Sequence, residues 1–132
     1  MALFRCGGGS SQPTETNLWT NADPTQQQAA VTLNLTGDID NFDAIVFEYK
    51  ANTAATDTSK AIYSPADVKK SSESVVSAMV MIGGSVQSSF AIVRAITYTS
   101  NTELHLTAGL QMHSTSGNNA SAILVNVIGL KY

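Results

Sequence analysis

The segment AAVTLNLT, residues 29–36, indicates the fold class because its apolar and polar residues alternate strictly. Val31, Leu33 and Leu35 fall on one face of an extended chain, and Thr and Asn residues fall on the other. This is the pattern of an antiparallel strand with one face toward a core and one toward solvent. Residues 42–50 repeat the alternation, so the first strand is not an isolated case.

Similar segments recur about every dozen residues along the chain, separated by Gly, Asn, Ser and Pro turn signals, and no helical period is sustained. Strands are expected at residues 17–20, 29–36, 42–50, 60–64, 74–82, 88–99, 102–112 and 121–131. Residues 65–70 begin with a proline and predict a turn or a single helical turn. The fold class is therefore all-β, a single antiparallel β-sandwich of jelly-roll or immunoglobulin-like type with about eight strands.

The alternation also predicts which side chains form the core. Arg94 falls on the apolar face of its strand and breaks the pattern, so a bulge or a sheet edge is expected there. The predicted core residues are Val31, Leu33, Leu35, Ile45, Phe47, Val76, Val80, Ile92, Ile96, Val125 and Val127.

Residues 1–13 differ from everything that follows. Leu3, Phe4 and Cys6 lie in a short apolar cluster, and a run of glycines and serines then links it to Pro13. An apolar segment on a flexible tether suits an arm that packs on a neighbouring subunit, although a frayed terminus has the same composition. Cys6 suits a small apolar side chain in that arm better than an intermolecular disulfide. We therefore expect an anchoring arm over 1–13 and the sandwich domain over 14–132.

Charge and hydropathy exclude several classes of partner. The chain has 132 residues, only 13% of them charged, and a formal net charge of −3, so no basic surface for nucleic acid can form. A third of the residues are Ser, Thr, Asn or Gln, which interrupt every long uncharged stretch, so no membrane contact is expected. The first residues lack the apolar core of a secretory signal, which favours synthesis in the cytoplasm.

Residues that carry chemistry are few and scattered. Glu103, His105 and His113 could face one side of a strand, but a zinc site needs further ligands. Asp38, Asp40 and Asp43 resemble part of a calcium loop without its spacing, and Asp is also an ordinary turn residue. We expect no catalytic residue, no metal, no cofactor and no enzyme activity.

Two aromatic residues, Trp19 and Tyr63, have polar neighbours in the sequence, unlike the aromatics at alternating strand positions. They are the candidate contacts for a host-surface glycan, by stacking on a sugar ring. The competing interpretation is packing at a sheet edge.

Five stretches carry a family resemblance, and they are spread over most of the chain. They are MALFRCGGG at 1–9, NLWTN at 17–21, DNFDAIVFEYK at 40–50, AITYTSNTEL at 95–104 and NASAILVNVIGLK at 119–131. Together they resemble small virion structural proteins of tailed bacteriophages and prophages. The last stretch is similar to the final strand of phage fibre and baseplate-tip domains. The resemblance implies a particle component and brings no catalytic or binding motif with it.

The resulting hypothesis is a non-enzymatic virion protein, displayed on the particle and held there by its arm. Its place is a tail fibre or baseplate tip, or a decoration or head fibre on the capsid, and its partners are other virion proteins. A homo-oligomer is expected, with a trimer as one candidate state, and neutral contacts rather than charge should hold it together. The alternative is a free carbohydrate-binding β-sandwich module of bacterial origin.

Overall fold

The structure, a computed structural model, describes residues 12–70, 74–82, 85–111 and 117–132, with the side chains of 78–82 and 85–90 outside that description. Its strands are β1 (Thr14–Thr20), β2 (Val31–Asn34), β3 (Ala44–Asn52), β4 (Thr58–Tyr63), β5 (Val75–Ile82), β6 (Ser85–Ser100), β7 (Glu103–Leu106), β8 (Leu110–Gln111) and β9 (Ser121–Lys131). A 3-10 helix, η1 (Ile39–Asn41), and one short helix, α1 (Pro65–Lys69), complete the described elements.

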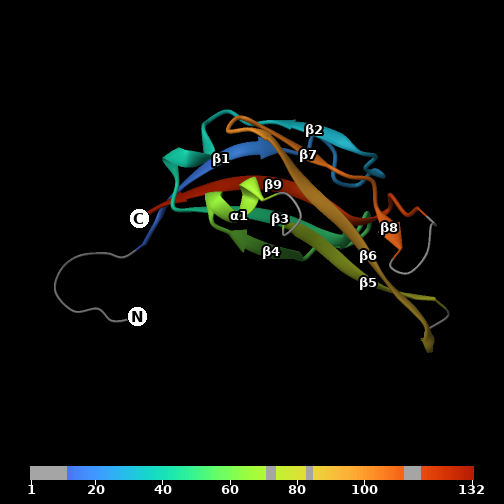
Figure 1. Cartoon of the computed structure of the whole chain (residues 1–132). Coiled ribbons are helices and arrows are strands. Elements are labelled where there is room, and N and C mark those ends of the chain that lie inside the picture. The colour runs from blue at the N-terminus through green and yellow to red at the C-terminus, as the bar shows by residue number, and fades with distance from the viewer. Residues whose placement is uncertain (1–11, 71–73, 83–84, 112–116) are drawn as a thin grey trace.

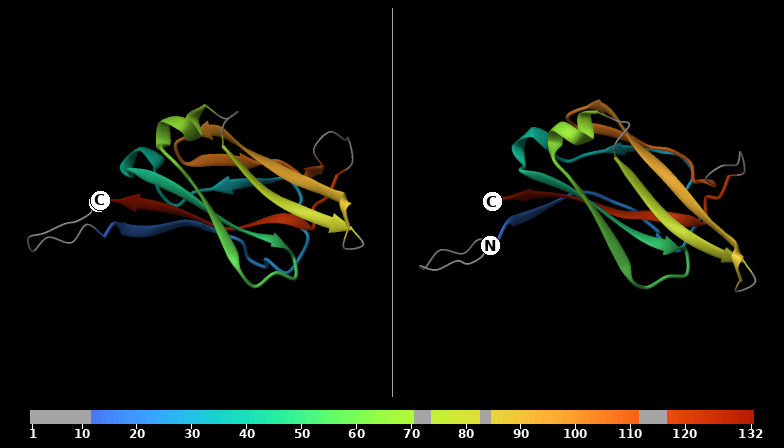
Figure 2. Two further views of the ribbon diagram at one scale, coloured as in Figure 1. Left: turned by 90° about the horizontal axis from the view of Figure 1, so that it is seen from below. Right: turned by 60° about the horizontal axis from the view of Figure 1, so that its bottom comes forward.

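The strands form two antiparallel sheets that pack as a sandwich (Figures 1 and 2). One sheet has the order β1-β9-β3-β4, and the other has β2-β7-β6-β5 with β8 also paired to β6. Chain neighbours are often not sheet neighbours, because β9 inserts between β1 and β3. The prediction of an all-β antiparallel sandwich is confirmed.

The core lies between the sheets and follows the predicted alternation over most of its length. The predicted residues found buried there are Leu33, Leu35, Ile45, Phe47, Val76, Ile92, Ile96 and Val127. Val31 is only partly buried against the core, and the side chain of Val80 lies outside the described residues. Leu18, Leu104 and Leu106, which the prediction did not include, are also fully buried.

One prediction in β9 is wrong. Val125 was expected in the core with Val127, but it is only partly buried, and Leu124 takes the inward position instead. The reason is a bulge: the β3–β9 register shifts between Glu48 and Tyr49, which inserts one extra residue in β9. Since side chains alternate with period two, one inserted residue exchanges the two faces beyond it.

The end of β9 shows why a glycine stands in an otherwise apolar strand. Gly129 is buried, and a Cβ atom added there would lie 2.5 Å from Cδ1 of Phe42. The aromatic ring therefore covers the bare backbone and closes this end of the core.

Residues 102–112, expected to be one strand, are two short strands, β7 and β8, separated at Thr107. At this break the Thr107 hydroxyl accepts from the Ala95 amide at 2.9 Å, and Arg94 on β6 lies beside it. Its guanidinium is completely buried and donates to the backbone carbonyls of Thr107, Asn119 and Ser121 at 3.1–3.2 Å. The bulge or sheet edge expected at Arg94 is wrong: β6 lies between β5 and the strands β7 and β8, and β5 pairs regularly with β6 at Arg94.

Burial lowers the pKa of Arg94 to about 10, so the guanidinium still carries its charge at neutral pH. Close by, Ala122 has φ 53°, a left-handed conformation that costs a non-glycine residue energy. The hydrogen bonds to the Asn119 and Ser121 carbonyls tie this turn to the middle of the other sheet.

Candidate interaction surface

The solvent face of the four-stranded sheet carries apolar side chains where polar ones are usual. Ile45 and Phe47 of β3 point into the core, so Val46 between them points outward. Its cross-strand partners are Ile62 of β4 and Ile128 of β9, which makes one apolar row across three strands. We call Val46, Ile62, Ile128 and Leu130 the apolar strip.

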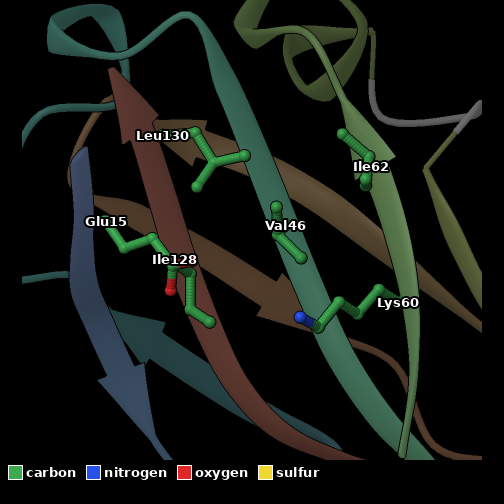
Figure 3. Close-up of a pocket in the computed structure, with 6 residues that line it drawn as sticks. All are labelled: Glu15, Val46, Lys60, Ile62, Ile128 and Leu130. Atoms are coloured by element: carbon green, nitrogen blue, oxygen red, sulfur yellow. The ribbon is translucent and has the colours of Figure 1, made fainter. Parts of the chain in front are cut away.

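The strip is exposed mainly at Ile62, because Val46 is only 3% exposed and Ile128 and Leu130 are half-buried. Ile62 is 61% exposed, more than the other large aliphatic side chains that the structure describes. With Glu15 and Lys60, the strip lines a shallow hollow of about 100 Å³ (Figure 3). One face of an antiparallel sheet is normally solvated and polar, so an apolar row on that face points to a contact surface.

The next rows of the same face are polar and hydrogen-bonded among themselves. Asn126 donates to Glu48 at 2.8 Å and accepts from Thr20 at 3.0 Å, and Thr58 donates to the other oxygen of Glu48 at 3.0 Å. This chain of bonds crosses the sheet from β1 to β4. The outer face is thus divided into a polar half, in which Thr20, Asn126, Glu48 and Thr58 bond to one another, and the apolar half formed by the strip.

Two opposite charges flank the strip. Glu15 on β1 and Lys60 on β4 stand at the two edges of the sheet, and both side chains reach inward toward Ile128 and Val46 (Figure 3). Among the described residues, neither of these charges forms an ion pair or a hydrogen bond through its side chain. Both charges therefore remain available to a partner.

A second apolar hollow lies on the five-stranded sheet. Val93 and Ala95 of β6 point away from the buried Arg94, and with Ala108 and Leu110 they line a space of about 460 Å³. Leu110 is 46% exposed. This hollow has no charged residue among its lining residues, which distinguishes it from the strip.

The structure does not bring the two candidate glycan residues together. Trp19 is on β1 and Tyr63 on β4, the opposite edges of the four-stranded sheet. The Tyr63 ring packs on Phe47, with centroids 5.9 Å apart, and its hydroxyl group donates to the Val75 carbonyl and accepts from the Val75 amide. Tyr63 is therefore occupied on its ring face and at its hydroxyl.

Trp19 is partly buried against the core and borders an open hollow of about 480 Å³. Two amide side chains of that hollow already serve the backbone of β9. Gln28 exchanges hydrogen bonds with Leu124, and Asn21 donates to the same carbonyl at 2.9 Å. Their role is to hold the 21–30 segment on the sheet, so few polar groups are left for a sugar.

The three aspartates near η1 serve separate structural roles. Asp38 caps η1 by accepting from the Asp40 amide, and Asp43 pairs with Lys131 and accepts from the Tyr132 amide. Asp40 accepts from Lys69 at 2.8 Å and from Asn101 at 2.9 Å. Their carboxylates face different partners, so they do not converge on one cation.

The Asp40–Lys69 contact predicts a pH effect on stability. The hydrogen bond from Lys69, aided by Asn101, lowers the pKa of Asp40 below its ordinary 3.8. A carboxyl group whose pKa is lower in the folded state stabilises the fold above 3.8, and this contribution disappears as pH falls through the folded pKa. We expect Asp40→Asn to lower the urea midpoint slightly at pH 7 and to unfold like the parent in strong acid. If the urea midpoints of the parent and Asp40→Asn differed by the same amount at all pH values, this prediction would be contradicted.

The other candidate residues lie apart from any site. Glu103 and His105 are both on β7, and His113 is outside the described residues, as are Leu3, Phe4 and Cys6 of the arm. Within the described ranges, no group of three or more His, Cys, Asp or Glu could hold a metal ion. No helix in those ranges is long and apolar enough to cross a bilayer.

The sequence analysis missed the apolar strip, although a signal for it was present. Val46, Ile62, Ile128 and Leu130 all occupy strand positions that alternate with core residues, and polar residues are usual there. Only the pairing of β9 between β1 and β3 brings them together.

No family model matches the chain, and a search of curated proteins finds no match.

Proposed function

We propose that this chain is a structural protein of a bacteriophage virion, displayed on the particle as a β-sandwich and anchored by its N-terminal arm. The observation that carries the proposal is the apolar strip on the outer face of the four-stranded sheet, which is exposed mainly at Ile62. The resemblance of the sequence to small phage virion proteins supports the same role. In this role the sandwich supplies rigid surfaces, and association is its function.

The proposal is tested on particles. Antibodies raised against the purified chain should label a defined part of phage particles released from a host that carries the gene, in negative-stain electron microscopy. Labelling at the tail tip or over the capsid distinguishes the two candidate placements. Particles that carry no label, with the chain present only in the particle-free lysate, would overturn the proposal.

The arm gives a second prediction. Deleting residues 1–11 removes Leu3, Phe4 and Cys6 and stops before β1, which begins at Thr14. Because none of the described core residues lies in this segment, we expect an unchanged thermal midpoint and a loss of incorporation into particles. The measurements are calorimetry on the purified variant and immunoblotting of purified particles. A large fall in midpoint with normal incorporation would contradict it.

A further inference from the structure

We propose that the free edge of β5 is the interface of a two-fold dimer, in which β5 of a second copy of this chain adds to it as an antiparallel strand. The β2-β7-β6-β5 sheets of the two copies then join into one continuous sheet. This interface is separate from the apolar strip, and the inference does not depend on the virion role.

The four strands at the sheet edges, β1, β4, β2 and β5, differ in how they are protected. An edge strand presents unpaired N–H and C=O groups, and proteins prevent unwanted pairing there with charged residues, with proline or by keeping the strand short. β1 carries Glu15, β4 carries Lys60, and β2 has only four residues. β5 has eight residues, and residues 74–93 include no Asp, Glu, Lys, Arg or Pro. The edge of β5 therefore lacks the protection that the other three edges have.

The hydrogen bonds at the start of β5 show which of its backbone groups face that edge. The Ile96 amide donates to the Ser74 carbonyl at 2.8 Å, so the even-numbered residues of β5 exchange hydrogen bonds with β6 in their regular pairing. The odd-numbered residues direct their amides and carbonyls away from β6. Val75 shows this orientation, because the Tyr63 hydroxyl group bonds to both its amide and its carbonyl.

Ser77 and Met79 are the next odd-numbered residues, and they lie beyond the contact with Tyr63. Among the described residues, β5 pairs with no strand other than β6, so the amides and carbonyls of these two residues face an open edge. The outer part of the β5–β6 hairpin extends past the other strands, which leaves room for a strand to approach (Figures 1 and 2).

A second copy of β5 supplies the missing partners. With a two-fold axis beside Ala78, Ser77 of each copy lies opposite Met79 of the other, and their outward amides and carbonyls form four hydrogen bonds. On the axis, Ala78 faces the partner copy's Ala78 at a pair with no hydrogen bonds, where Cα atoms are only about 4.5 Å apart. Alanine suits this position because its side chain is a single methyl group.

The absence of charge favours a second copy over another partner. Antiparallel pairing of two identical strands places each side chain near its own copy, so a charged strand would repel itself. The neutral hairpin of residues 74–93 meets this requirement of self-pairing. Because both copies use the same edge, the dimer leaves neither β5 edge free, and the assembly closes at two copies.

Disulfide cross-linking tests the register in the full-length chain, with Cys6→Ser as the common background. Ala78→Cys places two cysteines at the axis, within the Cα separation that a disulfide spans. Ser77→Cys is the matched control, because the two copies of residue 77 are diagonal neighbours about 7–8 Å apart, too far for a disulfide. Under mild oxidation, we expect Ala78→Cys to form a covalent dimer at least tenfold faster than Ser77→Cys, measured by intact mass.

Sedimentation velocity tests the backbone hydrogen bonds without a cross-link. We expect the parent to dimerise between about 10 μM and about 1 mM, the range of weak interfaces. Ser77→Pro removes an amide that β6 does not use and with it two of the four hydrogen bonds across the dimer, so the dissociation constant should rise at least tenfold. Ser77→Ala keeps the amide and should dimerise like the parent.

Three outcomes would overturn the inference. A parent that stays monomeric to about 1 mM has no such interface. A dimer that Ser77→Pro leaves intact, or equal cross-linking of the two cysteine variants, would place the contact elsewhere on the molecule. Should Ser77→Pro fail to fold, the two cysteine variants decide the question alone. These results are independent of particle labelling, so the dimer and the virion role can fail separately.

Discussion

Phe47→Ala should destabilise the chain by about 3–5 kcal/mol, one of the two largest effects expected of a single substitution here. Phe47 is completely buried at the centre of β3, between Val127 of β9 and Ala61 of β4, and its ring packs on Tyr63. Truncation removes the transfer free energy of the ring and leaves a cavity that the surrounding strands cannot close. The measurement is the free energy of unfolding from a urea titration.

The matched control is Ile62→Ala on the outer face of the same sheet. Because Ile62 is 61% exposed, the monomer should lose less than about 1 kcal/mol. Should Phe47→Ala fail to fold, Phe47→Leu keeps an apolar side chain of smaller volume and should cost about 1–2 kcal/mol. A cost below about 1 kcal/mol for Phe47→Ala would mean that β3 has the opposite face toward the core.

Arg94→Leu should cost about 3–5 kcal/mol, although it replaces a buried charge with an apolar side chain. The substitution removes four hydrogen bonds and leaves the carbonyls of Thr107 and Ser121 without the Arg94 donor, whereas the Asn119 carbonyl still accepts from the Gln28 amide. An unsatisfied buried polar group costs about 1–3 kcal/mol, and two such groups outweigh the free energy gained by no longer burying a charge. Urea unfolding at neutral pH measures the loss.

Arg94→Lys is the control that keeps the charge. A single ammonium group lacks the planar set of donors that reaches three separate carbonyls, so this variant should lie between the parent and Arg94→Leu. Hydrogen exchange adds a local measurement: the Gly109 amide, bonded to the Asn119 side chain at 3.0 Å, should exchange faster in both variants. An Arg94→Leu variant as stable as the parent would show that well-packed apolar atoms replace the network.

The sequence by itself determined the fold class and most of the core. Strict alternation in residues 29–36 and 42–50 requires one buried and one exposed face, and only a packed antiparallel sheet supplies these. The buried positions Leu33, Ile45 and Phe47 follow from that local rule alone. Arg94 was likewise recognisable as an interruption, because a charge on an apolar face is costly unless it is paired.

Only the tertiary structure decided where the alternation changes and which outer faces meet. The bulge beside Glu48 that turns Val125 out of the core arises from the pairing of β3 with β9, more than 70 residues away along the chain. Arg94 donates to the carbonyls of Thr107 and Asn119, whose positions depend on both sheets. The apolar strip and its flanking charges come from β1, β3, β4 and β9, which become neighbours only through the strand order. Local sequence determines which face of each strand is apolar. Long-range pairing determines which strands lie side by side, and the candidate interaction surface depends on this pairing.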